Sequence, residues 1–121
     1  VLFLTWDSDT SAINLIEDMG HKVIKIDNDE LLSKISEIKP DIVINDILDT
    51  DSKYIESLKE HGTFVVNFED LGDGADKAHL VFNALYEMTN PKPNRRFGYE
   101  YVCLNERFYL CDSIMFNNAP K

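Results

Sequence analysis

Acidic side chains stand at the ends of apolar, strand-like runs, and these are the residues best placed to do chemistry. Asp46 closes one run, and Glu69 and Asp70 come directly after the run that ends in Phe68. In a parallel α/β sheet, ligands bind beyond the carboxyl ends of the strands. We therefore take Asp46, Glu69 and Asp70 as candidate site residues. The adjacent pair Glu69–Asp70 suits a tight loop that meets a polar ligand such as sugar hydroxyls.

The loop from Glu69 to Gly74 also has a purely structural explanation. In a solvated turn its glycines, Gly72 and Gly74, would supply positive φ while the acids face water. The chain contains neither G-x-G-x-x-G nor G-x-x-x-x-G-K, so the loop is not predicted to bind phosphate. Both explanations of the loop stay open.

Asn83 lies in the short apolar run Leu80–Asn83. A buried amide is normally hydrogen-bonded, so its partner is either structural or a ligand.

Two D-x-D segments, Asp7–Asp9 and Asp49–Asp51, have the form of a divalent-cation site. Both precede stretches with helical periodicity, where Asp, Ser and Thr cap the first backbone N–H groups. With 22 Asp and Glu in 121 residues such a motif arises easily, so we interpret both as helix caps. The His and Cys residues have no metal-site spacing. The sequence therefore predicts no metal and no cofactor.

Asp46 has an alternative role. The stretch Asp41–Leu48 (Asp-Ile-Val-Ile-Asn-Asp-Ile-Leu) resembles the phospho-acceptor strand of bacterial receiver domains. Those domains also carry a Ser or Thr after the fourth strand and a Lys after the fifth. Here the corresponding residues, 67–70 and 83–86, are Asn-Phe-Glu-Asp and Asn-Ala-Leu-Tyr. A non-catalytic, receiver-like binding or regulatory module is therefore the second hypothesis.

Strand-like runs alternate with amphipathic stretches along the chain. The expected strands are Val1–Thr5, Lys22–Ile26, Asp41–Asn45, Thr63–Phe68 and Leu80–Asn83. The expected helices end near Gly20, Pro40 and Gly62. This alternation predicts βαβ units with right-handed crossovers, and hence a Rossmann-like α/β fold with a mostly parallel sheet.

The remaining segments have weaker patterns. Asn90–Arg96 contains two prolines and is predicted to be a loop. The aromatic-rich stretch Phe97–Phe116 is predicted to form short strands or helical turns at the sheet edge. We expect one domain over residues 1–116 and the start of a linker at 117–121.

The chain carries 22 acidic against 12 basic side chains, a net charge of −10. Such a charge repels phosphate backbones, which argues against a nucleic-acid partner. No apolar run approaches the ~18 residues of a membrane span, and no signal-peptide pattern is present. Cys103 and Cys111 have no redox spacing, so we expect free thiols and a cytoplasmic protein.

Residues 41–108 resemble a known family: the nucleotide-sugar hydrolases of pseudaminic acid biosynthesis and the related spore-coat polysaccharide proteins (PseG/SpsG-like). The shared features are a strand ending in Asp, a strand leading into an acidic pair and Leu-Gly, an apolar strand closing on Asn, and a later Gly-x-x-Tyr-x-x-Leu segment. In this chain they are Ile42–Asp46, Val65–Gly72, His79–Asn83 and Gly98–Phe108.

The resemblance implies the N-terminal half of a glycosyltransferase-B type enzyme, a sugar-nucleotide hydrolase or transferase of surface-polysaccharide or sialic-acid-like sugar synthesis. The nucleotide-sugar substrate would lie in a cleft shared with a second domain outside this chain. The residues implied on the sugar side of the cleft are Asp46, Glu69, Asp70, Asn83 and Tyr86.

The family's catalytic His follows its first strand in a Gly-rich loop, and Val1–Thr5 aligns better with the family's second strand. We therefore expect no catalytic residue in this chain and no hydrolase activity from the chain alone. We further expect it either to self-associate through an open sheet edge or to reorder its strands so that Val1–Thr5 fills the centre.

Overall fold

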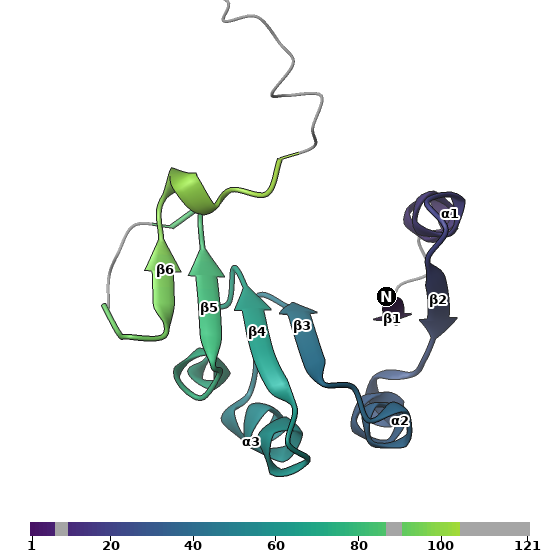
Figure 1. Cartoon of the computed structure of the whole chain (residues 1–121), viewed down its shortest axis with the longest axis horizontal. Helices are drawn as coiled ribbons and strands as arrows, with labels where there is room; N and C mark the ends of the chain where they lie inside the picture. Colours follow the sequence, from purple (N-terminus) through teal and green to yellow (C-terminus); the bar gives the residue numbers. More distant parts are fainter. Residues whose placement is uncertain (7–9, 87–90, 105–121) are drawn as a thin grey trace, which may run out of the picture.

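The computed structural model of the chain describes residues 1–6, 10–86 and 91–104. Strands and helices alternate along it, and the strand pairings of this part are parallel (Figure 1). The strands are β1 Leu2–Thr5, β2 Lys22–Lys25, β3 Ile42–Asp46, β4 Phe64–Phe68, β5 Leu80–Asn83 and β6 Arg95–Phe97. The helices are α1 Thr10–Asp18, α2 Leu31–Ile38 and α3 Ser52–Glu60, with the short 3₁₀ turns η1 Asn28–Glu30, η2 Asp73–Asp76 and η3 Tyr99–Tyr101. The predicted Rossmann-like α/β fold is confirmed.

The strands form two sheets rather than one. β1 pairs with β2, and a four-stranded sheet has the order β3-β4-β5-β6. No pairing joins β1 to β3 among the described residues. The sheet is thus interrupted between β1 and β3, and the reordering that would place Val1–Thr5 at the centre of a continuous sheet is not found.

The helix ends follow local sequence signals. Gly20, with φ of 84°, closes the turn after α1, and only glycine adopts such a conformation without strain. Lys39 takes the left-handed position after α2, with φ of 51°. At the start of α3, the Asp51 carboxylate accepts the backbone N–H groups of Lys53 and Tyr54. The D-x-D segment at 49–51 therefore ends in a helix cap, as predicted.

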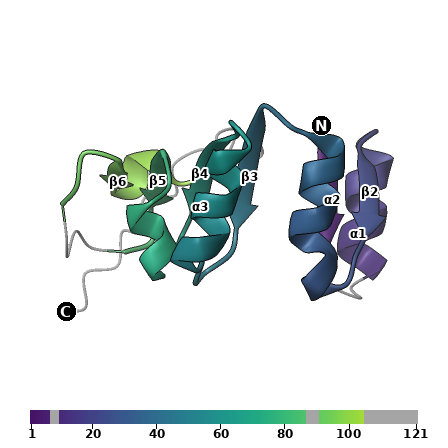
Figure 2. The ribbon, with the colours of Figure 1, turned by 90° about the horizontal axis from the view of Figure 1, so that it is seen from below.

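One face of the four-stranded sheet carries the core. The buried apolar cluster consists of Ile35, Ile55, Leu58, Val65, Ala75, Ala78 and Val81. Leu4 of β1 and Leu31 of α2 pack against this cluster. The two-stranded sheet therefore contributes to the same core as the four-stranded sheet. Figures 1 and 2 show α2 and α3 on this side of the strands, whereas α1 lies on the opposite side, beside β2.

The segment after β5 corrects one prediction. The loop expected at 90–96 is wrong for its last two residues, because Arg95 and Arg96 begin β6 and lie opposite Val81 and Phe82 of β5. The local sequence does not indicate β6, because this strand has no apolar run. It is held in place by pairing with the open edge of β5. The aromatic-rich segment is described only to Leu104 and contains η3. Its remainder and the expected linker lie outside the described residues.

Candidate functional site

Asp46 and the pair Glu69–Asp70 lie at the same edge of the four-stranded sheet. Asp46 ends β3 and is in register with Phe68, the last residue of β4, so Glu69 and Asp70 follow at the same level. The Asp46 side chain is exposed. Asp7 follows the first strand-like run and would be expected at the same edge, but it lies outside the described residues. The parallel arrangement therefore gathers the carboxyl ends of neighbouring strands, where ligands of such folds bind.

A chain of buried polar side chains crosses the sheet beneath these loops. The Tyr54 hydroxyl donates to Asn45 Oδ1 at 2.8 Å, and the Asn45 amide donates to Asn67 Oδ1, also at 2.8 Å. The Asn67 amide then donates to Asp70 Oδ2 at 2.6 Å. Asn45, Asn67 and Asp70 are all buried. The network links α3, β3 and β4 to the loop after β4, and such buried hydrogen bonds rigidify what they join.

The Asp70 carboxylate is occupied by protein donors. Its Oδ1 accepts the backbone N–H groups of Thr50 and Gly72, each at 2.9 Å. Its Oδ2 accepts the Thr50 hydroxyl at 2.5 Å as well as the Asn67 amide. Because Asp70 is 0% exposed and both oxygens are engaged, we assign it a positioning role in place of the substrate contact that the sequence suggests.

Gly72 and Gly74 allow the loop after β4 to approach the loop after β3. A Cβ at Gly72 would lie 2.6 Å from Asp49 Oδ1, and one at Gly74 would lie 2.9 Å from the Asp51 carbonyl oxygen. The positive φ of this loop belongs instead to Glu69, at 52°. The expectation that these glycines supply positive φ is therefore wrong. They are needed because a side chain would not fit.

Glu69 and Asn83 join this loop to the end of β5. The Glu69 carboxylate accepts the backbone N–H groups of Ala84 at 2.9 Å and Leu85 at 3.3 Å. The Asn83 amide donates to the Asp70 carbonyl oxygen at 3.1 Å. Asn83 Oδ1 is buried and has no hydrogen-bond partner within the described part of the chain. Since buried polar atoms are rarely left so, this oxygen keeps an unused acceptor capacity beneath the loop after β4.

Tyr86 is the last of the residues singled out in the sequence. It follows Asn83 in the segment after β5 and is 36% exposed. The structure thus brings Asp46, Glu69, Asp70 and Asn83 to one sheet edge, and Tyr86 lies just beyond it.

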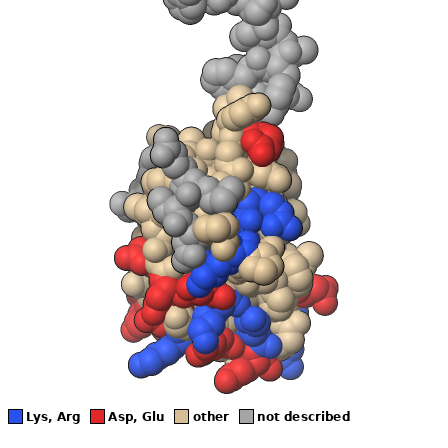
Figure 3. Space-filling model, turned by 90° about the vertical axis from the view of Figure 1, so that its left-hand side faces the viewer, with Lys and Arg blue, Asp and Glu red and all other residues tan. Residues whose placement is uncertain are grey.

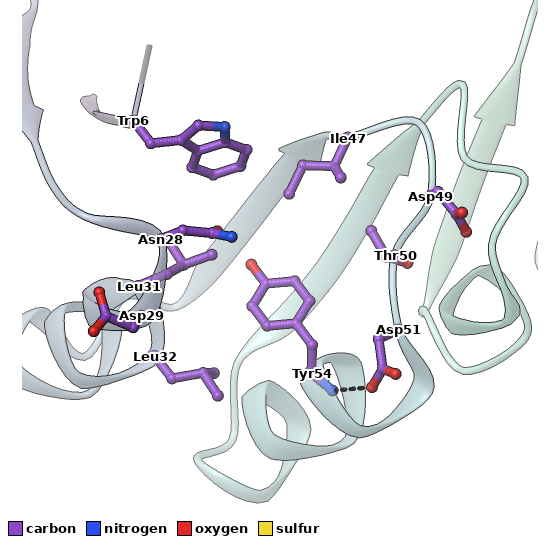
Figure 4. Close-up of a pocket in the computed structure, with 10 residues that line it drawn as sticks. All are labelled: Trp6, Asn28, Asp29, Leu31, Leu32, Ile47, Asp49, Thr50, Asp51 and Tyr54. Carbon is purple, nitrogen blue, oxygen red and sulfur yellow. Dashed lines mark hydrogen bonds between the residues drawn. The ribbon is translucent and has the colours of Figure 1, made fainter.

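A pocket of about 510 Å³ opens at the carboxyl ends of β1 and β3, beside the first turns of α2 and α3 (Figure 4). Its lining residues are Trp6, Asn28, Asp29, Leu31, Leu32, Ile47, Asp49, Thr50, Asp51 and Tyr54. The Trp6 indole, the Asn28 amide and the Tyr54 hydroxyl point toward a common space, whereas the carboxylates of Asp29 and Asp49 point away from it. The pocket therefore combines aromatic rings with neutral hydrogen-bonding groups.

Tyr54 connects the pocket to the buried network. Its hydroxyl donates to Asn45, and burial raises the pKa of Tyr54 to about 12, which extends the pH range over which this donor keeps its proton. The hydroxyl oxygen retains the capacity to accept a hydrogen bond. Trp6 is 50% exposed and offers ring surface to a ligand.

The charges around the pocket disfavour phosphate. Asp29, Asp49 and Asp51 line it, and among the described residues no Lys or Arg does. Figure 3 shows basic and acidic side chains interspersed on the β6 side of the molecule, where Lys92 and Arg95 both pair with Asp76. Over residues 1–6, 10–86 and 91–104, no group of three or more His, Cys, Asp or Glu is arranged to hold a metal ion. Nor does any helix of that part have the length and apolarity needed to cross a bilayer.

Sequence reasoning did not find Trp6, Asn28 or Tyr54. Trp6 comes directly after β1, so its position beyond a strand end is the same signal that indicates Asp46. Asn28 lies in a stretch whose sequence indicates only a helix cap, and Tyr54 in one that indicates only the apolar stripe of a helix. Only the packing of α2 beside α3 brings them to one pocket.

Comparison with known proteins finds an archaeal relative of the chain but no matching family model. No family model matches the chain, and no solved structure matches it significantly. The chain is similar to the uncharacterized protein MJ1062 of Methanocaldococcus jannaschii, with 33% identity over 130 residues that cover 98% of this chain. The chain spans 27% of the length of that relative.

Proposed function

We propose that this chain is the sugar-binding half of a sugar-nucleotide hydrolase or glycosyltransferase-like enzyme that acts in surface-polysaccharide or sialic-acid-like sugar synthesis. The observation that carries the proposal is the convergence of Trp6, Asn28 and Tyr54 in one pocket at the carboxyl ends of β1 and β3. Aromatic faces pack against the apolar faces of sugar rings, and amide and phenol groups hydrogen-bond with sugar hydroxyls.

The nucleotide is bound elsewhere in this proposal. Phosphate groups are held by Arg, Lys or backbone N–H groups, whereas the described part of the chain lines this pocket with three Asp residues and no basic side chain. A second domain outside this chain would therefore carry the nucleotide. The relative is long enough to contain one, since the chain spans 27% of it.

The residues at the sheet edge have distinct roles. Trp6 stacks on the sugar ring, while Asn28 and Tyr54 bind its hydroxyl groups. The exposed Asp46 ends β3, at the strand end where the pocket opens. The group that activates water or the acceptor comes from outside these residues, as the family resemblance implies.

The test uses the longest natural polypeptide that contains this chain and measures nucleotide release from a panel of UDP- and CMP-sugars. We expect turnover of at least one sugar nucleotide. Trp6→Ala should raise KM about tenfold, which is the scale of one lost aromatic contact. The matched control is Tyr99→Ala, since Tyr99 is an aromatic residue of η3 that is 88% exposed. Absence of turnover and binding across the panel, or equal effects of the two variants, would contradict the proposal.

A receiver-like regulatory module is the second candidate, favoured by the exposed position of Asp46 at the end of β3. In the 2-1-3-4-5 sheet order of receiver domains the first and third strands are neighbours. The described strands β1 and β3 do not pair, which favours the enzyme. Treatment of the same polypeptide with acetyl phosphate separates the two, because a receiver gains one phosphoryl group that Asp46→Ala abolishes.

A further inference from the structure

The buried hydrogen bonds that run from Asp70 to Tyr54 have a fixed direction. A carboxylate has no proton to donate, so it can only accept hydrogen bonds. Asp70 Oδ1 accepts two backbone N–H groups at 2.9 Å, and Oδ2 accepts the Thr50 hydroxyl at 2.5 Å and the Asn67 amide at 2.6 Å. The Asp70 end of the network therefore forces each neighbour to present a donor.

Two buried amides carry this direction across the sheet. Because the Asn67 NH₂ group is directed to Asp70, its carbonyl oxygen faces the other way, where it accepts the Asn45 NH₂ group at 2.8 Å. The Asn45 carbonyl oxygen then faces Tyr54 and accepts its hydroxyl at 2.8 Å. Turning either amide over would bring two acceptors or two donors together. Asn45 and Asn67 are buried, so such a mismatch would be costly.

The Tyr54 hydroxyl at the end of this network offers the pocket only its lone pairs. A phenol has a single proton to donate, and its oxygen also accepts. The Tyr54 proton is directed to Asn45, while Tyr54 lines the pocket and its hydroxyl points toward the space shared with Trp6 and Asn28 (Figure 4). A ligand group that hydrogen-bonds with Tyr54 must therefore supply the proton.

We propose that Tyr54 is a specificity-determining acceptor that selects a hydrogen-bond donor of the ligand. Asn45, Asn67 and Asp70 are positioning residues, which set this polarity from beneath the pocket without touching the ligand. The ligand group that faces Tyr54 is a hydroxyl, an amide N–H or an ammonium group, and not an ether, carboxylate or phosphate oxygen. That the ligand is a sugar rests on the proposed function, whereas the polarity of the network does not.

The charges of the pocket agree with this selection. Asp29, Asp49 and Asp51 line it, and no Lys or Arg does so within the described part of the chain. An anionic oxygen of a ligand would therefore meet lone pairs at Tyr54 and negative charge around it, and like charges repel. A hydroxyl or ammonium group would find an acceptor at Tyr54 and a favourable potential.

Raman spectroscopy of the longest natural polypeptide that contains this chain tests the polarity without a ligand. The intensity ratio of the tyrosine Fermi doublet differs between a phenol that donates a hydrogen bond and one that only accepts. Subtracting the spectrum of Tyr54→Phe from that of the parent isolates the signal of Tyr54. We expect the ratio of a phenol that donates, whether or not it also accepts. The ratio of a phenol that only accepts would overturn the proposal.

A matched pair of variants tests whether the network sets this polarity. Asn45→Leu removes the acceptor of the Tyr54 proton, while Asn83→Leu removes another buried amide, one that donates to the Asp70 carbonyl oxygen. We expect the Tyr54 doublet to change in Asn45→Leu and to stay as in the parent in Asn83→Leu. An unchanged doublet in Asn45→Leu would refute the positioning role. Should that variant not fold, the parent spectrum decides the polarity on its own.

Deoxyfluoro analogues of a sugar nucleotide that the polypeptide turns over test the selection itself. Fluorine is similar in size to a hydroxyl group but has no proton to donate. At one sugar position we expect fluorine to raise KM about tenfold in the parent, the scale of one hydrogen bond left without its partner. In Tyr54→Phe the same fluorine should cost less than about twofold, because the acceptor is gone.

The control for the analogues is Tyr99→Phe, which changes an exposed tyrosine of η3 and should keep the full tenfold loss of the parent. Equal fluorine effects in the parent and in Tyr54→Phe at every sugar position would contradict the proposal. If no sugar nucleotide is turned over, the proposed function fails, and the Raman spectrum of the parent still decides whether Tyr54 presents an acceptor to the pocket.

Discussion

The Asp70 carboxylate binds Thr50 through two hydrogen bonds, one from the backbone N–H at 2.9 Å and one from the hydroxyl at 2.5 Å. Thr50 belongs to the loop after β3 and lines the pocket, whereas Asp70 belongs to the loop after β4. Both residues are buried. The wall of the pocket is therefore fixed by a residue that does not reach the pocket itself.

Asp70→Asn is expected to destabilise the protein, because the amide would turn an NH₂ group toward backbone or side-chain donors. The free energy of unfolding should fall by about 2 kcal/mol or more, the scale for an unsatisfied buried group. Urea denaturation measures it. Asp41→Asn, at an exposed position before β3, is the control and should change stability by less than about 0.5 kcal/mol. Similar losses in both variants would contradict the assigned role.

Tyr54 should keep its proton to high pH. Burial raises its pKa from 10.0 to about 12, because the phenolate is poorly solvated in the folded protein. Since the folded pKa is raised, this contribution to stability is present below pH 10.0 and is lost as the pH rises toward 12. Near-ultraviolet absorbance of the folded protein should show a late-ionising tyrosine that is missing in Tyr54→Phe. Identical titration curves would refute the burial of this hydroxyl.

His79 should make the fold sensitive to acid. Partial desolvation of its ring, and secondarily the positive charge of Lys59, hold the pKa of His79 below its ordinary value of 6.5. Its Nδ1 accepts the Val65 backbone N–H at 3.0 Å, which requires an unprotonated nitrogen. Because the folded pKa is depressed, the stabilisation is complete above pH 6.5 and is lost as the pH falls through the folded value.

Melting temperatures across this pH range measure the His79 contribution. The slope between neutral and acidic pH should be smaller in His79→Gln than in the parent protein. His61→Gln is the control, since His61 is exposed and its Nδ1 lies 2.7 Å from the Ser57 carbonyl oxygen of the same helix. An unchanged slope in His79→Gln would show that another group is responsible.

Divalent cations are expected to bind no more tightly than about millimolar, the range of weak carboxylate sites. Asp51 of the D-x-D segment caps α3 and is already engaged with backbone N–H groups. Calorimetric titration with Mg²⁺ and with Mn²⁺ measures the affinity. Micromolar binding that disappears in Asp49→Ala would contradict this and favour a metal-dependent transferase.

The sequence alone determined the order and type of the main elements. The apolar run that ends in Asp46 and the stop at Gly20 act over a few neighbouring residues, so a local pattern suffices to place a strand or a helix end. The gathering of Asp46 and Glu69 at one edge also follows from the sequence, because parallel strands share the edge at which they end.

Only the tertiary structure decided which of the candidate site residues are buried and which partners they contact. Glu69 and Asp70 are neighbours in the sequence, yet Asp70 is fully buried. It is buried because it packs against Thr50, which lies 20 positions away in the chain. The pocket likewise joins Trp6, Asn28 and Tyr54 from separate elements. The β6 strand and the interruption between β1 and β3 depend on which edges meet. Burial and pairing depend on contacts between distant segments, and no local pattern of residues encodes those contacts.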